Sequence, residues 1–388
     1  RKENRGAAIV SAMRQIEIAN PDTLYGVLSM FSSQKWTNKA ILNDSKIRDL
    51  IEHLSKRKLG NKDYPADLMG DAYEILLKKF ADDSKAQAGE FYTPRSVVRL
   101  LVHILDPQPG ETVYDPACGS GGMLIEAIRY MHDDSLCCGS IFGQEKNVVN
   151  AAIAKMNLFL HGASDFNVMQ GDTLRDPKIL QGGNIAKFDC VIANPPFSLE
   201  NWGATEWSSD KYKRNIYGTP SDSCGDYAWI QHMICSMSSG KGRMAVVMPQ
   251  GILFRGNQEA EIRKQLVESD LIEAVVTLGD KLFYGTGLSP CFLIIRRMKQ
   301  AHHSGRILMI DGSKILTQKR AQNILEENDI DRLYSLYQNY SDEEDYSRIV
   351  TLQEIRDKEY NLSPNRYVVY HKEEIRPYAE VLAEFKQA

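Results

Sequence analysis

The sequence lacks the features that define several specialised classes of protein. Its 388 residues contain no uninterrupted apolar stretch near the ~18 residues that a membrane-spanning helix needs, so we expect no membrane association. Its seven cysteines form no C-x-x-C pair, which argues against a disulfide framework or a zinc site, and we expect no metal. It has no internal repeat, and its 27 glycines and 14 prolines are too few for a collagen-like chain.

An excess of basic residues is also missing. The chain has 47 Lys and Arg against 51 Asp and Glu, a net charge of −4, which argues against a free-standing polybasic nucleic-acid binder. Residues 1–5 lead into no apolar signal segment, and the first residue is not Met. We therefore expect a cytoplasmic protein whose N-terminal part is incomplete in this chain.

Hydrophobic periodicity divides the chain into three parts. In residues 1–88 apolar residues recur every three to four positions, which predicts an N-terminal helical domain. Residues 89–310 alternate short apolar runs with amphipathic stretches, the pattern of a parallel sheet covered by helices on both faces. Residues 311–388 are polar and carry the acidic run 342–345, and we predict a C-terminal helical tail there.

The middle part contains seven strand candidates. They are residues 112–114, 140–142, 167–169, 190–193, 244–248, 272–278 and 291–295. Helices are predicted between them at 122–131, 150–161, 227–238 and 258–269. Thr93 and Pro94 predict a further helix start, with Thr93 as its cap and Pro94 in its first turn.

A glycine-rich turn follows the first strand candidate, and acids end the first three. In a parallel sheet such turns lie at the carboxyl edge, where glycines let the backbone approach a ligand. Asp115 places a negative charge beside this turn, which suits a cationic ligand better than a pyrophosphate. Glu145 can accept hydrogen bonds from ribose hydroxyls and Asp172 from an exocyclic amine, with Leu174 available to pack on a purine. Helix capping remains the alternative for each acid taken singly.

The fourth strand candidate runs into Asn194-Pro195-Pro196-Phe197. Two prolines hold the chain extended and block a helix, so the Asn194 amide and the Pro195 carbonyl can converge on one point. Two converging acceptors suit a planar –NH₂ group, and Phe197 offers a stacking face for its ring. The alternative is an ordinary proline turn with Phe197 buried in the core.

Taken in order, these motifs carry a family resemblance. Gly89-Glu90-Phe91-Tyr92-Thr93-Pro94-Arg95, the glycine turn 115–121, Glu145, Asp172 and the motif 194–197 resemble the gamma-class amino-methyltransferases of DNA. The sequence closely resembles the modification (methyltransferase) subunit of type I restriction–modification systems. The resemblance implies a seven-stranded, Rossmann-like sheet and methyl transfer from S-adenosylmethionine to the N6 amine of a flipped-out adenine in double-stranded DNA.

The resemblance also assigns roles to individual residues. Asn194, Pro195, Pro196 and Phe197 would form the catalytic motif. The cofactor would contact Glu90, Phe91, Tyr92, Thr93, Pro94, Arg95, Asp115, Ala117, Gly119, Ser120, Gly121, Glu145, Asp172, Thr173 and Leu174.

Partners follow from the same resemblance. The residues after 310 are too few for duplicated recognition modules, so a separate specificity subunit is expected, with two modification subunits on each and a restriction subunit as a further partner. Docking surfaces are expected in the helical domain 1–88 and in the tail 311–388. The domain 89–310 would be the catalytic domain.

The segment 198–225 mixes Lys211, Lys213 and Arg214 with aromatic residues beside the proposed base pocket. Such interleaving predicts a DNA-contacting loop, whereas the alternative is a loop whose aromatics pack on the sheet. Two other functions remain open at this point. One is methylation of a protein glutamine side chain, and the other is a non-catalytic DNA-binding scaffold subunit.

Overall fold

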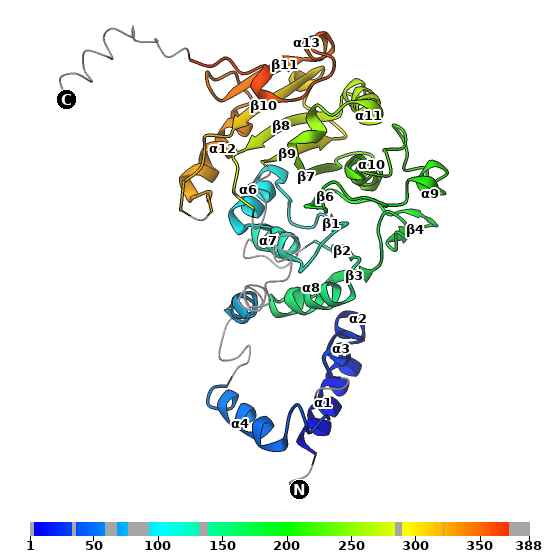
Figure 1. Cartoon of the computed structure of the whole chain (residues 1–388), viewed down its shortest axis with the longest axis vertical. Helices are drawn as coiled ribbons and strands as arrows, with labels where there is room; N and C mark the ends of the chain where they lie inside the picture. Colours follow the sequence, from blue (N-terminus) through cyan, green and yellow to red (C-terminus); the bar gives the residue numbers. More distant parts are fainter. Residues whose placement is uncertain are drawn as a thin grey trace, which may run out of the picture.

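The computed structural model of the chain describes residues 4–32, 36–58, 68–76, 93–131, 139–283, 289–320 and 322–371. The centre of these ranges is a nine-stranded sheet with the strand order β11-β10-β8-β9-β7-β6-β1-β2-β3 (Figure 1). Its strands are β1 Val113–Asp115, β2 Ile141–Glu145, β3 Phe166–Gln170, β6 Cys190–Ala193, β7 Arg243–Pro249, β8 Ile272–Leu278, β9 Pro290–Arg296, β10 Arg306–Gly312 and β11 Ser347–Thr351. A separate pair, β4 Leu180–Gln181 and β5 Asn184–Ile185, forms a small antiparallel ribbon.

The sheet is largely parallel. Strands β3, β2, β1, β6 and β7 run in one direction, and β9 is antiparallel between β7 and β8. Every residue of β6, β7 and β8 is buried, and most of them are apolar. The chain leaves β1 for β2 and β3 on one side and returns to β6 on the other. This reversal makes the carboxyl ends of β1 and β6 a topological switch point, the usual ligand-binding position in such sheets.

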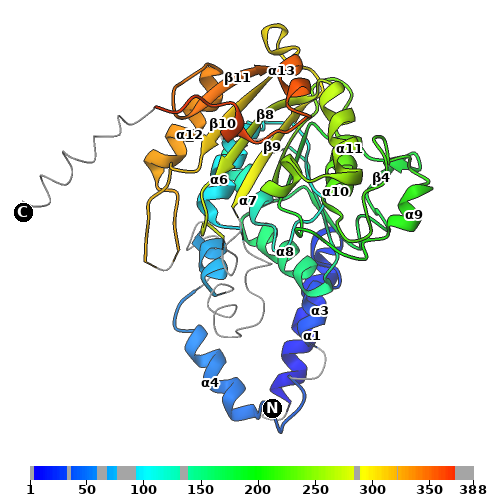
Figure 2. The same ribbon diagram turned by 45° about the horizontal axis from the view of Figure 1, so that its top comes forward.

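Helices cover both faces of the sheet (Figures 1 and 2). One core contains apolar residues of α6 Arg95–Leu105, α7 Gly122–Met131, α8 Val148–Leu160 and α12 Glu327–Asn339. The other core contains residues of α10 Asp226–Ser236 and α11 Asn257–Glu268. Strand side chains alternate between the two cores, as period-two geometry requires. The shorter helices are α9 Ala204–Ser208 and α13 Leu352–Asp357, with 3₁₀ turns η2 Gln250–Leu253, η3 Ala301–His303 and η4 Pro364–Arg366.

The predicted mixed architecture is confirmed, but the predicted number of seven strands is wrong. All seven candidates form strands, and β10 and β11 add two more. The tail 311–388 is therefore not wholly helical, since β11 pairs antiparallel with β10, which crosses the proposed boundary at 310. An edge strand buries little of its surface, so β11 lacks the apolar pattern that identifies a central strand. The position of β11 in the sheet depends on its pairing with β10.

The described residues of the N-terminal part form several helices. Its helices are α1 Arg5–Ala19, α2 Pro21–Leu24, α3 Val27–Ser32 and α4 Asp44–Leu54, followed by a helix at 68–76. Figure 1 shows α1 to α4 to one side of the sheet, where α2 and α3 contact α8. Within the described ranges, no helix is long and apolar enough to span a membrane.

Candidate active site at the switch point of the sheet

The predicted polar residues meet at one edge of the sheet. Asp115 ends β1, Glu145 ends β2, Asp172 follows β3 and Asn194 follows β6. These four strands are neighbours and parallel, so their carboxyl ends lie side by side. The sequence prediction that these side chains share one site is consistent with this topology.

The glycine turn is tied to the acid of the next strand. Gly119 and Gly121 have φ values of 53° and 85°, in the left-handed region that favours glycine. The Gly119 N–H donates to Glu145 Oε2 at 3.0 Å, and the Asn147 N–H donates to Glu145 Oε1 at 2.7 Å. The Ser120 carbonyl accepts from the Asn157 amide at 3.1 Å. These bonds hold the turn at the edge of β2, and each carboxylate oxygen keeps a second lone pair for a ligand.

Asp115 is a buried carboxyl group. Its side chain accepts from the Ala117 N–H at 2.9 Å, and among the described residues it has no ion-pair partner. Burial, with a smaller contribution from the charge of Glu145, raises the pKa of Asp115 to about 8. Burial also raises the pKa of Glu145. Two carboxyl groups that resist ionisation side by side are suited to a cationic ligand, which would stabilise their charged forms.

The segment after β3 is held in two ways. Asp172 forms an ion pair with Lys146, with 2.9 Å between its Oδ2 and the lysine Nζ. The Thr173 hydroxyl donates to the Pro116 carbonyl at 2.6 Å and is buried, so it joins this segment to the glycine turn. Leu174 is buried in the core on the α10 side. Asp172 Oδ1 also accepts from the Arg175 N–H at 3.3 Å. The carboxylate keeps further lone pairs for a ligand amine, and contacts of Thr173 and Leu174 with a cofactor stay predictions.

The Asn194 amide has a defined orientation. Its Nδ2 donates to Thr93 Oγ1 at 2.8 Å, while its Oδ1 is buried and has no hydrogen-bond partner among the described residues. The prediction that Thr93 caps α6 is wrong. Pro94 occupies the N-cap position without a side-chain cap, because the Thr93 hydroxyl is engaged with Asn194.

The other residues of the proline motif, Pro195 to Phe197, are held by packing and by a hydrogen bond from the next residue. Pro195 is buried, Pro196 is exposed, and the half-buried Phe197 ring lies 6.4 Å from the Phe283 ring, centroid to centroid. The following residue, Ser198, has a φ of 49°, and its N–H donates to the Asp226 carboxylate at 2.7 Å. The motif therefore has the rigid turn that the sequence predicts, and Phe197 remains partly accessible.

The predicted DNA contacts from the segment 198–225 are only partly compatible with the structure. Arg214 is 1% exposed and donates to Asp210 and to the carbonyls of Thr173 and Leu174. Its guanidinium also stacks on the buried Trp207 ring at 4.4 Å. The prediction that Arg214 contacts DNA is therefore wrong, because no part of its charged end faces solvent.

Two neighbours of Arg214 differ from it. Lys211 and Lys213 are exposed, so their proposed contact with DNA stays a prediction. The aromatics Trp202 and Trp207 pack in the core, as the alternative interpretation of this segment stated. Sequence alone did not identify Arg214 as a structural residue, although Asp210, four residues earlier, was a possible signal.

Three predicted cofactor residues, Glu90, Phe91 and Tyr92, lie outside the described residues. Arg95 is exposed at the start of α6, and its guanidinium lies 3.7 Å from Asp71. Its predicted contact with the cofactor remains a prediction.

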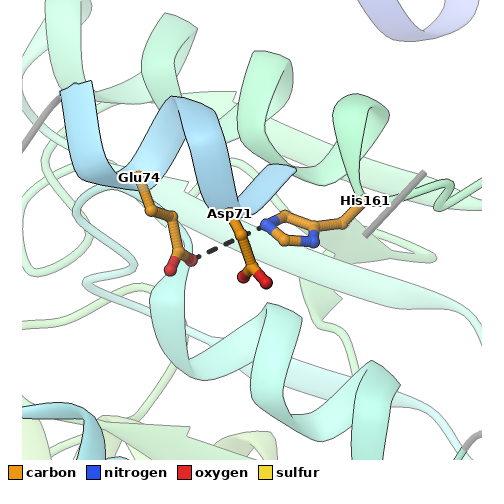
Figure 3. A group of neighbouring side chains, drawn as sticks. All are labelled: Asp71, Glu74 and His161. Carbon is orange, nitrogen blue, oxygen red and sulfur yellow. Dashed lines mark ion pairs between the residues drawn. The ribbon is translucent and has the colours of Figure 1, made fainter. Parts of the chain in front are cut away.

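A group of polar residues that the sequence did not indicate lies near Arg95. Figure 3 shows Asp71 and Glu74 from the helix 68–76 beside His161, which follows α8, with His161 Nε2 3.7 Å from Glu74 Oε1. Arg129 donates to Asp71 at 2.6 Å. The guanidinium groups of Arg129 and Arg95 already supply positive charge to this group, so we assign no metal to it.

The chain is similar to several characterised sequences. Residues 64–375 match the family model described as N-6 DNA Methylase. The methylase subunit of the type I restriction enzyme MjaVII from Methanocaldococcus jannaschii is 38% identical, over 88% of this chain and 59% of that relative. The methylase subunit of the type I restriction enzyme HindI from Haemophilus influenzae is 31% identical, over 90% of this chain and 76% of that relative.

A solved structure of the same kind of subunit is also similar to this chain. The methyltransferase subunit of a type I restriction–modification system from Streptococcus thermophilus is 29% identical with a TM-score of 0.82, covering 94% of this chain and 77% of that chain. The chain spans about three fifths of the MjaVII relative. The resemblance inferred from the motifs is confirmed. Because the family match extends over most of its length, this chain belongs to the N-6 DNA methylase family.

Proposed function

We propose that this chain transfers a methyl group from S-adenosylmethionine to the exocyclic N6 amine of an adenine flipped out of double-stranded DNA. The observation that carries the proposal is the buried Asn194 Oδ1, which has no hydrogen-bond partner among the described residues. Buried polar atoms rarely lack a partner. An acceptor left open beside Pro195, at the switch point of the sheet, is suited to an –NH₂ group that a substrate brings.

The strand-end acids support S-adenosylmethionine as the cofactor. Asp115 is a buried carboxyl group without a cation among the described residues, so it fits the positively charged methionine end. Glu145 would accept from the ribose hydroxyls, and Asp172 would accept from the adenine amine beside its ion pair with Lys146. Gly119 and Gly121 would let the backbone approach the ligand. When bound, the cofactor supplies a methyl group already activated by its sulfonium.

The role of the protein is then to orient the target amine. The lone pair of an adenine amine is delocalised into the ring, which makes it a poor nucleophile. Hydrogen bonds from both amine protons to Asn194 Oδ1 and the Pro195 carbonyl would favour a pyramidal nitrogen with an available lone pair. Phe197 would stack on the base. Alignment of this kind can lower a barrier by up to roughly 7–11 kcal/mol.

We further propose that a separate specificity subunit directs the chain to its DNA sequence. The named relatives are subunits of type I restriction enzymes, which supports this arrangement. The net charge of −4 also supports a partner subunit that contributes much of the affinity for DNA. Two modification subunits on each specificity subunit, a restriction subunit as a further partner and a cytoplasmic location complete the proposal.

The test is transfer of a labelled methyl group to an adenine-containing duplex, with and without a co-expressed specificity subunit. Asn194→Ala should lower kcat by about 10²-fold or more, the usual cost of removing an oriented hydrogen-bonding group from a transition state. Asn167→Ala, which changes an exposed asparagine on β3, is the matched control and should retain activity. Full activity of Asn194→Ala, or transfer to a protein extract in place of DNA, would refute the proposal.

A further inference from the structure

Thr93 and Asn194 are 101 positions apart in the sequence but form a direct hydrogen bond. Thr93 lies immediately before the N-cap of α6, and Asn194 immediately after β6. Helix α6 packs against β6 and β7, which brings its beginning to the carboxyl end of β6. The distance from Asn194 Nδ2 to Thr93 Oγ1 is 2.8 Å. The bond therefore joins the first sequence motif to the proline motif.

This bond distinguishes the two ends of the Asn194 amide. An asparagine side chain has one end that donates hydrogen bonds and one that accepts them. The hydroxyl of Thr93 takes the donating end. The accepting end, Oδ1, then points elsewhere and is buried without a partner among the described residues. The Thr93 hydroxyl thus holds the amide in place. Because a hydroxyl can donate as well as accept, it is the donating substrate amine that favours the orientation seen here.

We propose that Thr93 is a positioning residue that holds the Asn194 side chain where its Oδ1 can accept from the substrate amine. This inference rests on the proposed function, because it requires Asn194 to accept from that amine. In the opposite orientation the Asn194 NH₂ group would face the substrate NH₂ group, and two donors cannot form a hydrogen bond. The family resemblance assigns Thr93 to the cofactor, whereas the observed bond connects its hydroxyl to the catalytic motif.

The two roles predict different kinetics. A positioning role affects the step in which the amine is oriented, so loss of the hydroxyl should lower kcat and leave the dissociation constant of S-adenosylmethionine unchanged. A cofactor contact would instead weaken S-adenosylmethionine binding. Thr93→Val removes the hydroxyl at nearly constant volume, and Thr93→Ser keeps it.

The experiment measures kcat for methyl transfer, and the dissociation constant of S-adenosylmethionine by calorimetry, on the full chain co-expressed with its specificity subunit. Thr93→Val should lower kcat roughly 2- to 10-fold, the effect of losing one ordinary hydrogen bond that holds the amide in place. Thr93→Ser should restore kcat to near the original value. Thr93→Ala, measured in parallel, should match Thr93→Val and gives the answer if the valine variant folds poorly.

Thr112→Val is the matched structural control. The Thr112 hydroxyl donates to Asp189 at 2.9 Å, before β1 and at the opposite edge of the sheet. Its loss should lower thermal stability without changing kcat below the melting temperature. A drop in kcat of the same size in Thr112→Val and Thr93→Val would indicate a general structural effect and overturn the inference.

Two further outcomes would also overturn it. One is an unchanged kcat in both Thr93→Val and Thr93→Ala. The other is weaker S-adenosylmethionine binding with unchanged kcat, which would assign Thr93 to the cofactor. Asn194→Ala separates the two hypotheses. If that variant loses activity while the Thr93 variants keep it, only the positioning role fails, and if it stays fully active the proposed function fails as well.

Discussion

The backbone N–H of Ser198 donates to the buried Asp226 carboxylate, with 2.7 Å between the nitrogen and Oδ1. This bond connects the residue after the proline motif to the first turn of α10. The other carboxylate oxygen of Asp226 accepts from Arg255, which also bonds Glu259 at 2.6 Å. A non-glycine residue with positive φ, as at Ser198, is held there only by such surrounding contacts.

Asp226→Asn should therefore lower both stability and activity. Asparagine can still accept from Ser198, but its NH₂ group would face Arg255, so we expect a loss of about 1–3 kcal/mol in the free energy of unfolding. Denaturant unfolding and methyl-transfer rates measure the two effects. Asp222→Asn, which changes an exposed acid of the same segment, is the control. Equal stability of the two variants would contradict the anchoring role.

Arg214 is expected to act as a structural residue. Its removal would leave the Asp210 carboxylate, whose side chain is 7% exposed, without its partner. We expect Arg214→Ala to cost about 3–5 kcal/mol of unfolding free energy, the usual effect of breaking a buried ion pair. Arg356→Ala breaks an exposed pair with Glu268 and should change stability little. Similar unfolding curves for the two variants would contradict the buried role.

Lys211 and Lys213 are expected to act on DNA binding without affecting stability. Both are exposed, and Lys211 Nζ lies 4.6 Å from the centre of the Tyr212 ring. Replacing both with Ala should weaken binding and flatten its salt dependence, by roughly 0.9 in the log–log slope for each lost phosphate contact. Titrations at several salt concentrations measure this slope. Lys241→Ala, in an exposed turn before β7, should leave it unchanged, whereas an unchanged slope in the double variant would refute the DNA role.

The pKa of Asp115 predicts how cofactor binding depends on pH. A bound cation favours the ionised carboxylate and lowers its pKa from about 8, so binding below pH 8 must release a proton. The contribution of Asp115 to affinity should therefore grow as the pH rises and level off above about 8. Calorimetry in buffers with different ionisation enthalpies measures the released proton.

Asp115→Asn is the reference for this experiment, because the α-amino group of the cofactor itself titrates at about pH 8. The variant should bind more weakly and lack the part of the pH dependence that Asp115 contributes. Identical pH profiles for the two proteins would contradict the assignment of Asp115 to the cationic end of the ligand.

Local features explain which parts of the fold were predictable. The helix predicted at 122–131 has the bounds of α7, because a glycine turn starts it and its apolar residues follow a helical period. The seven predicted strands were found because each contains a short apolar run. Strand β11 was missed because it lies at the edge of the sheet and has few apolar residues, so no local pattern identifies it.

The amino-acid sequence by itself determined the order of the elements and the residues at each strand end, since periodicity, turn residues and motif spacing are local properties. Only the tertiary structure decided which side chains meet. Thr93, predicted as a helix cap, instead accepts a hydrogen bond from Asn194. Arg214, predicted as a DNA contact, is instead buried and donates to the Thr173 carbonyl. The Thr93 bond depends on contact between segments far apart in the sequence. The role of Arg214 depends on whether its charge is solvated or is buried and paired, and packing sets the free-energy difference between these two states.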